Sequence, residues 1–196
     1  MSTAFPDLHQ VDWSQIPAPE DDGAARHLEG MRVPDVALSA TDGSSVSLAK
    51  LAGLTIVYAY PRTGRPREIS PIPDWDMIPG ARGCTPQSCA FRDHHADLTA
   101  AGADHVFGLS TQGTAYQREM AERLHLPFPV LSDERLELAR TLRLPIMEVG
   151  GLTLLKRLAM VIEEGLIVKV FYPVFPPDRN AADVLAWLQQ RQASRS

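Results

Sequence analysis

The sequence has few of the features that mark secreted, membrane or nucleic-acid-binding proteins. Two cysteines in 196 residues are too few for the disulfide framework of a small secreted domain or for a structural zinc site. No apolar run approaches the roughly 18 residues that span a bilayer, and we expect no secretory leader. The net charge of −5 comes without a basic stripe, which disfavours nucleic-acid binding. We therefore expect one α/β domain in the cytoplasm, with no membrane partner.

Both cysteines lie in one short segment, residues 83–93, which reads GCTPQSCAFRD. The segment follows a strand predicted over 54–60 and a loop rich in proline. It opens a helix predicted over 86–101, with Thr85 as its N-cap. Cys84 then lies at the positive end of the helix dipole, where an anion is stabilised. This placement indicates a redox-active cysteine.

Cys89 lies five residues after Cys84 in the same segment. Over five helical residues, two side chains diverge by about 140° and are separated by about 7.5 Å along the axis. A disulfide needs Cα atoms within about 7 Å, so the pair cannot close while this turn stays helical. Two inert buried thiols are one interpretation, because cysteine is often a small core residue. A peroxide-reacting cysteine, oxidised to sulfenic acid and then trapped by a second thiol, fits the spacing better.

The segment GCTPQSCAFRD resembles the active-site segment of the peroxiredoxins, in particular the PrxQ or bacterioferritin-comigratory-protein group. The resemblance includes the Gly-Cys-Thr start, the Gln three positions after the first cysteine and the Phe-Arg-Asp after the second. It extends over about residues 28–190. The resemblance implies that Cys84 is the peroxidatic cysteine, Cys89 the resolving cysteine and Gln87 a polar residue that supports the pocket.

The resemblance also implies a catalytic arginine. Residues 157–171 predict a β-hairpin around a Glu-Glu-Gly turn. The family places an arginine at the start of the first hairpin strand, aimed at the peroxidatic sulfur, and Arg157 occupies that place. A fixed guanidinium near Cys84 favours the thiolate and donates hydrogen bonds to the peroxide oxygens. Lys156 is expected to face the opposite side and the solvent.

Residues 62–82 depart from the family pattern. Prolines recur through this stretch, which predicts an ordered loop that walls the peroxide pocket. The family has a Pro and a Thr seven and three residues before the peroxidatic cysteine, where this chain has Met77 and Ala81. One interpretation is that an insertion splits the motif and Thr63 returns to the pocket. In the other, Thr63 is an ordinary turn residue and its role is lost or taken by a backbone group.

The other patterns predict an α/β thioredoxin fold with an N-terminal extension and a proline-rich insertion before the active-site helix. Residues 1–27 form an extended lead-in, in which Trp13 docks onto the body, and residues 28–196 form one thioredoxin-like domain. The further predicted elements are a strand within 30–43, a helical turn at 46–52, strands at 104–110 and 128–131, helices at 113–126 and 133–144, an irregular connection at 145–155, and a closing helix at 180–192 capped by Asp178 or Asn180.

On this resemblance we expect an antioxidant enzyme, a thiol-dependent peroxidase that reduces hydrogen peroxide and organic hydroperoxides. Its Cys84 sulfenic acid is resolved by Cys89 as an intramolecular disulfide, which thioredoxin or glutaredoxin then reduces. We expect no cofactor or metal ion, and a monomer or weak homodimer suffices. The alternatives are a peroxide sensor that does not turn over and a thiol–disulfide oxidoreductase of thioredoxin fold. The second generally uses Cys-x-x-Cys, in which the sulfurs meet without unwinding.

Overall fold

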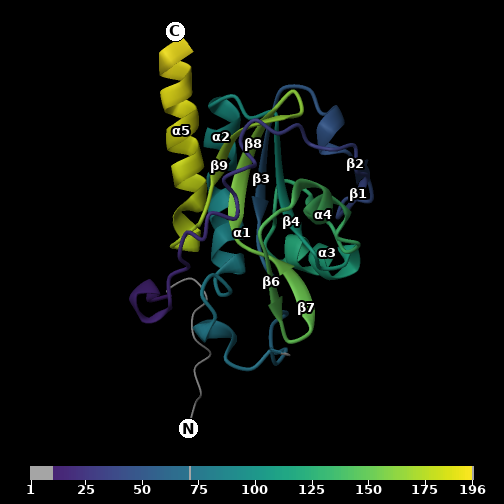
Figure 1. The fold of residues 1–196 in the computed structure, drawn as a ribbon, viewed down its shortest axis with the longest axis vertical. Coiled ribbons are helices and arrows are strands. Elements are labelled where there is room, and N and C mark those ends of the chain that lie inside the picture. The colour runs from purple at the N-terminus through teal and green to yellow at the C-terminus, as the bar shows by residue number, and fades with distance from the viewer. Residues whose placement is uncertain (1–10, 71, 196) are drawn as a thin grey trace.

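The computed structural model describes residues 11–70 and 72–195. A seven-stranded sheet forms its centre, in the order β2-β1-β5-β4-β3-β8-β9 (Figure 1). The strands are β1 (Leu38–Ala40), β2 (Ser45–Val46), β3 (Leu54–Ala59), β4 (His105–Ser110), β5 (Val130–Ser132), β8 (Leu158–Glu163) and β9 (Leu166–Phe171). Every residue of β3 is buried, as its continuous apolar sequence predicts for a strand covered on both faces. It pairs in parallel with β4 and antiparallel with β8, which confirms its central place.

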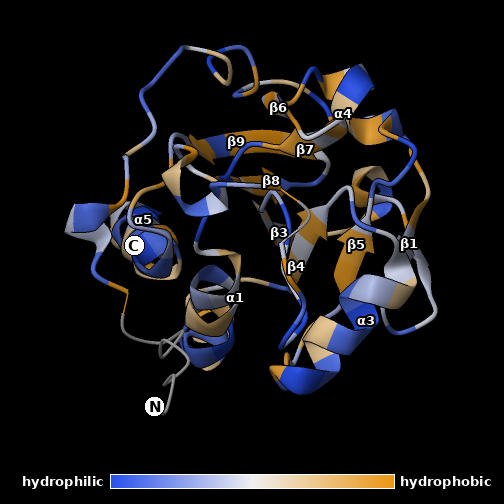
Figure 2. Cartoon of the chain, turned by 90° about the horizontal axis from the view of Figure 1, so that it is seen from below, coloured by the Kyte–Doolittle hydropathy of each residue, from blue (hydrophilic) through white to orange (hydrophobic). Residues whose placement is uncertain are grey.

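Helices cover both faces of the sheet. They are α1 (Cys84–Asp93), α2 (His95–Ala100), α3 (Thr114–Arg123), α4 (Glu137–Leu142) and α5 (Asn180–Arg195). Figure 2 shows α1, α3 and α5 on one side of the sheet and α4 on the other, and the buried side chains form one apolar cluster on each side. This is the thioredoxin-like arrangement that the sequence predicts. Within the described residues, no helix is both long and apolar enough to cross a membrane.

The predicted helix over 86–101 is wrong at its start and in its middle. α1 begins two residues earlier, at Cys84, and it is separated from α2 by His94, whose φ and ψ of −91° and 3° leave the helical region. The His94 ring nitrogen Nδ1 lies 2.9 Å from the carbonyl oxygen of Ala90, to which it donates. The His94 amide donates to the same Ala90 carbonyl oxygen at 3.0 Å, so the break is a change of backbone angles and not a loss of helical pairing at this residue. The predicted end is correct, because Gly102 follows α2 with a left-handed φ of 97°.

The predicted irregular connection at 145–155 is also wrong. It contains the antiparallel strands β6 (Ile146–Val149) and β7 (Leu152–Leu155), which form a separate two-stranded sheet. Their turn consists of Gly150 and Gly151, both with positive φ, as a two-residue hairpin turn of this kind requires. The Gly-Gly pair between two apolar runs was the available sequence signal.

The proline-rich insertion and the N-terminal segment both pack against the domain. In residues 62–70 and 72–82, the described part of the insertion, the one short 3-10 turn is Trp75–Met77, and the rest runs as an irregular loop. A second 3-10 turn, Trp13–Gln15, lies below α5 in Figure 1, and the Trp13 Nε1 donates to Asp178 Oδ2 at 2.9 Å. The predicted docking of Trp13 is confirmed. The first ten residues of the predicted lead-in lie outside the described residues.

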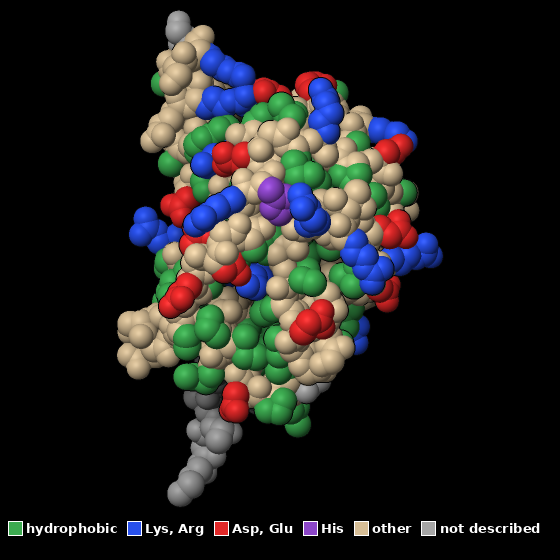
Figure 3. All heavy atoms as spheres, viewed as in Figure 1, with side chains coloured by type: hydrophobic (Ala, Val, Ile, Leu, Met, Phe, Trp, Pro, Cys, Tyr) green, Lys and Arg blue, Asp and Glu red, His purple; other side chains and the backbone are tan. Residues whose placement is uncertain are grey.

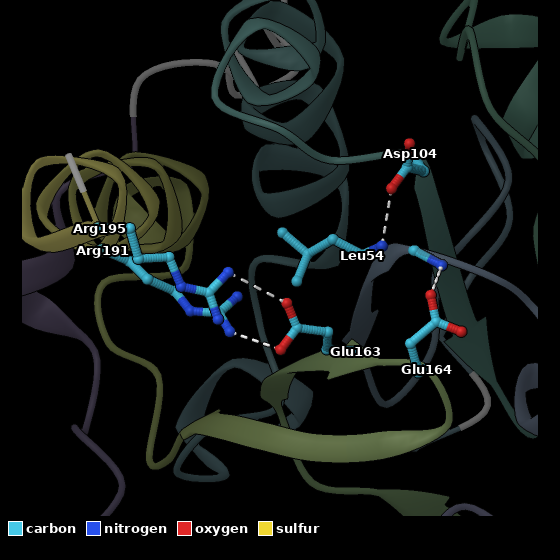
Figure 4. A network of polar contacts seen from close by, with 7 residues as sticks. Leu54, Asp104, Glu163, Glu164, Arg191 and Arg195 are labelled. Atoms are coloured by element: carbon cyan, nitrogen blue, oxygen red, sulfur yellow. Dashed lines mark hydrogen bonds and ion pairs between the residues drawn. The ribbon is translucent and has the colours of Figure 1, made fainter.

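At the end of the sheet remote from the first turn of α1, carboxylates bind neighbouring elements together (Figure 4). Glu163, the last residue of β8, accepts from Arg191 Nη2 at 2.6 Å and from Arg195 Nη1 at 3.3 Å, and both arginines lie on α5. The amide of Leu54, which starts β3, donates to Asp104 Oδ2 at 2.7 Å. These contacts fix α5 and the start of β3 to the same end of the sheet.

Candidate active site

Cys84 is the first residue of α1, so its sulfur lies at the N-terminal end of the helix. The predicted N-cap, Thr85, is wrong: the N-cap is Gly83, which has a left-handed φ of 107°. A methyl group at this glycine would lie 2.5 Å from Pro177 Cγ and 2.8 Å from Trp13 Cη2. Only glycine combines this backbone conformation with so close an approach, and it allows the helix to begin at the cysteine.

Arg157 lies directly before β8 and reaches back to the start of α1. Its side chain is 2% exposed, and its Nη2 lies 3.3 Å from the Cys84 sulfur. The same nitrogen donates to three consecutive carbonyl oxygens at the end of the insertion, those of Gly80, Ala81 and Arg82, at 3.2, 3.2 and 3.0 Å. The backbone of the insertion therefore aims the guanidinium at the sulfur.

Gln87 supports the other nitrogen of the same guanidinium. Its Oε1 accepts from Arg157 Nη1 at 2.5 Å, and its Nε2 donates to Asn180 Oδ1 at 2.9 Å. Gln87 and Asn180 are 0% and 1% exposed. Arginine can only donate, so it fixes the oxygen of Gln87 toward itself, and the Gln87 NH₂ then requires an acceptor from Asn180. The three side chains form one chain of hydrogen bonds with a single possible direction.

No carboxylate neutralises Arg157 within the described residues. Its hydrogen-bond partners are carbonyl and amide oxygens and the Cys84 sulfur, and it takes part in none of the ion pairs of that part of the chain. A buried charge is costly unless it is paired, and a guanidinium does not deprotonate in proteins. The positive charge is therefore available to a Cys84 thiolate and to negative charge that develops on a peroxide.

Ala81 stands where the family has threonine, and its backbone contacts the sulfur. The Cys84 thiol donates to the Ala81 carbonyl oxygen over 3.6 Å. A carbonyl accepts hydrogen bonds but cannot donate them to a peroxide oxygen, as a hydroxyl does. Among the described residues, the hydrogen-bond donor at the sulfur is Arg157 Nη2.

Thr63 is buried but is bonded to Gln112. Its amide and hydroxyl lie 2.8 and 3.3 Å from Gln112 Oε1, and its carbonyl oxygen accepts from Gln112 Nε2 at 3.0 Å. Among the described residues, no hydrogen bond joins Thr63 to Cys84. Its predicted role in the pocket stays a prediction, whereas Gln112 is a partner that no sequence pattern indicated.

Cys89 lies in the same helix as Cys84, and both cysteines are free and buried. Burial raises the pKa of the Cys89 thiol, although the charge of the nearby Arg92 opposes this effect. With about 140° between the two side-chain directions, the sulfurs cannot meet in the intact helix. Phe91, two residues after Cys89 in α1, stacks on the ring of Tyr58 from β3, with centroids 4.3 Å apart.

The predicted cap of the closing helix is wrong, and its correction identifies a site residue. Asp178 accepts from Trp13, and Asn180, the first residue of α5, accepts from Gln87. Within the described part of the chain, neither side chain accepts a hydrogen bond from a backbone amide of the first turn of α5. Across residues 11–70 and 72–195, no group of three or more His, Cys, Asp or Glu side chains is arranged to hold a metal ion.

Comparisons with known proteins agree with this geometry. Residues 28–185 match the redoxin family. Peroxiredoxin Q of Oryza sativa subsp. japonica, a chloroplastic protein, is 32% identical over 163 residues, which are 82% of this chain and 66% of the rice protein. The chloroplastic peroxiredoxin Q of Suaeda salsa is 30% identical over 84% of this chain and 69% of its own length. The chain thus spans about two thirds of the length of these curated relatives, and just under two thirds of the rice protein.

Solved structures share the fold. Peroxidoxin BcpB from Mycobacterium tuberculosis superposes with a TM-score of 0.66 and 24% identity, over 83% of this chain and 96% of that protein. A Xanthomonas campestris peroxiredoxin Q structure gives a TM-score of 0.64 and 22% identity, over 81% of this chain and 92% of that one. At these identities the likeness shows the fold alone.

Proposed function

This chain belongs to the redoxin family and, within it, to the peroxiredoxin Q group, and from that premise we propose that it is a thiol-dependent peroxidase. In this proposal Cys84 is the peroxidatic cysteine, Cys89 is the resolving cysteine and Arg157 stabilises the charges that appear and move. Gln87 holds Arg157 in place. The observation that carries the proposal is the 3.3 Å contact between the Arg157 guanidinium, which has no carboxylate partner in the described part of the chain, and the Cys84 sulfur.

In the first step the Cys84 thiolate attacks the terminal oxygen of a hydroperoxide, ROOH. The sulfur–oxygen bond forms as the oxygen–oxygen bond breaks, and the sulfur supplies the two electrons that leave with RO⁻. The terminal OH remains on the sulfur as sulfenic acid, and RO⁻ takes a proton from solvent to become ROH. The guanidinium stabilises the thiolate before the attack and the departing oxygen during it, without moving.

In the second step Cys89 displaces the hydroxyl of the sulfenic acid to give the Cys84–Cys89 disulfide and water. The first turn of α1 must unwind for this step, because the helix keeps the sulfurs apart. Burial raises the pKa of Cys89, so in the folded helix it stays a protonated thiol and a poor nucleophile. Unwinding therefore both brings Cys89 to Cys84 and exposes it to water, where it ionises more readily.

In the third step an external dithiol exchanges with the disulfide and restores both thiols. A thiol reductant such as thioredoxin is what the peroxiredoxin family implies, and we propose thioredoxin or a glutaredoxin for this chain. Because both cysteines lie in one subunit, a monomer or weak homodimer suffices for turnover. A cytoplasmic location likewise stays a prediction of the sequence.

The test is stopped-flow tryptophan fluorescence of the reduced protein mixed with hydrogen peroxide, compared with Cys89→Ser and Cys84→Ser. We expect oxidation many orders of magnitude faster than that of a free thiol in the parent and in Cys89→Ser, and none of this fast phase in Cys84→Ser. Only the parent should form an intramolecular disulfide. Reaction of all three proteins at free-thiol rates would overturn the proposal.

The peroxide sensor remains the second candidate because the carbonyl of Ala81 stands where the family has a hydroxyl. A sensor would be oxidised once and would not recycle with thioredoxin and thioredoxin reductase. Steady turnover of NADPH in that coupled assay excludes it. Reduction of insulin disulfides by the protein would instead support the thiol–disulfide oxidoreductase.

A further inference from the structure

The loop that leads into α1 is covered on its outer side by a segment near the N-terminus. The Cη2 atom of Trp13 lies 2.8 Å from the place where a methyl group on Gly83 would be. Pro19 Cβ lies 3.6 Å from the corresponding place on Gly80, which is ordinary van der Waals contact. Both glycines belong to the short loop that ends at the first residue of α1. We call residues 11–22 the strap, because they run along this loop.

The Trp13 ring is held in place by residues that precede α5. Its Nε1 donates to Asp178 Oδ2 at 2.9 Å, and its ring meets the ring of Phe175 edge to face, with centroids 6.0 Å apart. The other two residues of its 3-10 turn are exposed. Figure 3 shows this turn standing out at the lower left of the molecule, where Figure 1 places it below α5. The turn is therefore held against the domain by one aromatic side chain.

The other end of the strap is tied to the domain by Asp22. Its carboxylate accepts from Lys156 Nζ at 2.6 Å and from the Tyr172 hydroxyl at 2.7 Å. The hydrogen bond from Lys156, followed by that from Tyr172, holds the pKa of Asp22 well below its usual range. Lys156 is thus not a free solvent lysine, as its sequence position predicted, but the anchor of a tether.

The first turn of α1 depends on Gly83. The amide of Gln87 donates to the Gly83 carbonyl oxygen at 3.0 Å, which is the first helical hydrogen bond of α1. Disulfide formation requires this turn to unwind, so this hydrogen bond must break. Pro177 also lies against Gly83, but it is buried and leads directly into α5. Because not even a methyl group fits between Gly83 and these neighbours, the chain cannot leave its helical path on this side unless the Trp13 ring moves.

A contact made only with the folded turn opposes unwinding. Each such contact lowers the population of the unwound turn by the factor that corresponds to its free energy. Cys89 attacks only from the unwound turn, so the rate of disulfide formation falls by the same factor. The reaction of Cys84 with peroxide takes place on the folded turn, and the contact does not slow it. Trp13 therefore acts on the second step of the reaction and not on the first.

We propose that the strap holds the first turn of α1 in its folded form, with Trp13 as the positioning residue, and so sets how fast Cys89 traps the Cys84 sulfenic acid. The inference rests on the proposed peroxidase function and adds a control over its second step. The strap lies outside residues 28–185, the segment that matches the redoxin family. The control is thus supplied by a part of the chain that the family match does not cover.

The rate of trapping decides between two fates of the sulfenic acid. In one, Cys89 forms the disulfide and water leaves. In the other, the sulfur of the ionised sulfenic acid attacks the terminal oxygen of a second hydroperoxide, and two electrons leave with RO⁻ as the oxygen–oxygen bond breaks. The proton of the transferred OH passes through solvent to RO⁻, which becomes ROH. The product is a sulfinic acid, which thiols do not reduce, so slow trapping gives more of it at high peroxide.

The experiment mixes the reduced protein with hydrogen peroxide, quenches the reaction with acid at a series of times, and measures the thiol, sulfenic, disulfide and sulfinic forms by intact mass. Mass is the readout because the variants change a tryptophan. Trp13→Ala should form the disulfide about tenfold faster, the effect of losing one contact worth about 1.4 kcal/mol. Its yield of sulfinic acid at high peroxide should fall, whereas the rate constant of the first step should equal that of the parent.

Two milder variants test the strap from different positions. Trp13→Phe keeps a ring against Gly83 but loses the hydrogen bond to Asp178. Asp22→Ala frees the other end of the strap, away from the ring. Each should speed disulfide formation by less than Trp13→Ala does. Circular dichroism checks the fold of every variant, and these two decide the question if Trp13→Ala does not fold.

Trp187→Ala is the matched control. Trp187 is half-buried like Trp13, but its ring lies 5.4 Å from the guanidinium of Arg191, which binds Glu163 at the other end of the sheet. This variant should form the disulfide at the rate of the parent. Parent rates in all folded strap variants, or equal acceleration in Trp187→Ala and Trp13→Ala, overturn the inference and leave the peroxidase proposal standing. A parent protein whose Cys84 does not react rapidly with peroxide overturns both.

Discussion

Arginine side chains are held in different ways at the two ends of β8. At the far end, Glu163 receives Arg191 and Arg195, and the carboxylate neutralises part of their charge (Figure 4). At the near end, Arg157 is held by three carbonyl oxygens and by Gln87, none of which carries a charge. The first arrangement fixes a helix to a sheet. The second fixes a guanidinium but leaves its charge uncompensated.

The difference identifies which arginine is suited to chemistry. An exposed or half-exposed ion pair contributes little to stability and stabilises no further anion, because its cation already has one. A buried guanidinium that contacts only neutral acceptors is unfavourable until an anion arrives beside it. Here the nearest group able to become that anion is the Cys84 sulfur. Burial of Arg157 without a charged partner therefore favours the Cys84 thiolate and the transition state of its attack on the peroxide.

The largest expected effect follows from removing the uncompensated charge. Arg157→Met should lower the second-order rate constant of Cys84 with hydrogen peroxide by about 10²–10³-fold, the cost of losing one donor that stabilises transition-state charge. Arg157→Lys should recover only part of this loss, because an ammonium lacks the fork that bonds the sulfur and Gln87 together. Stopped-flow oxidation of the reduced proteins measures both.

The matched control is an arginine of α5 that contacts the other end of β8. Arg191→Met removes a guanidinium of the same size whose charge is already paired with Glu163. It should leave the rate constant with peroxide unchanged and lower the free energy of unfolding by at most about 1 kcal/mol. Equal losses of rate in Arg157→Met and Arg191→Met would mean that both arginines affect the rate only by stabilising the fold. That result would contradict a specific role of the Arg157 charge in the reaction.

A smaller effect is expected from the residue that holds Gln87. Asn180→Ala leaves the Gln87 NH₂ group buried without an acceptor, at a cost of about 1–3 kcal/mol of stability. Gln87 is then free to turn away from Arg157, and the rate constant with peroxide should fall by about tenfold, or about 1.4 kcal/mol in the barrier. Asn180→Asp keeps an oxygen toward Gln87 and should restore most of the rate.

A double-mutant cycle separates positioning from loss of stability. If Asn180 acts through Gln87 on Arg157, Asn180→Ala should have no further effect on the rate constant in an Arg157→Met background. Additive losses in the double mutant would show that Asn180 acts by another route. The rates are measured well below the unfolding transition of each variant, so that only folded protein contributes.

The sequence predicts the parts of this site that lie close together along the chain or that follow a strong pattern. The apolar run of β3 gives a central strand, and the segment around Cys84 and Cys89 gives a helix start with two thiols. Arg157 is predicted because it stands at the start of a hairpin strand, where the family resemblance expects it. These assignments depend on local patterns that tertiary packing did not override.

The rest depends on contacts between distant segments. Asn180 lies 93 residues from Gln87, and from the sequence its position favoured a helix cap, because asparagine is common there. The tether from Asp22 to Lys156 spans 134 residues. The β6–β7 hairpin was missed for another reason, because a local Gly-Gly turn forms it and apolar periodicity does not signal such a turn.

The two cysteines of α1 also lie in opposite surroundings. Cys84 lies beside a cation at the helix start, whereas burial raises the pKa of Cys89. A thiol with a raised pKa in the folded state contributes stability that is present below its unfolded pKa of about 8.5 and is lost as the pH rises through the folded pKa. The reduced protein should therefore lose stability above about pH 8.5, because unfolding allows Cys89 to ionise.

This smallest effect is measured in a Cys84→Ser background, in which no intramolecular disulfide forms. Urea unfolding at a series of pH values from 7 to 10 should show a steeper loss of stability in Cys84→Ser than in Cys84→Ser/Cys89→Ala, because the alanine has no proton to release. Tyrosines away from Cys89 contribute equally to both proteins and cancel in the difference; one is Tyr172, whose pKa is raised by burial and by Asp22. Identical slopes would mean that Cys89 ionises as readily in the folded helix as in the unfolded chain. Cys89 would then be able to attack without first gaining exposure to water, and unwinding would serve only to bring the two sulfurs together.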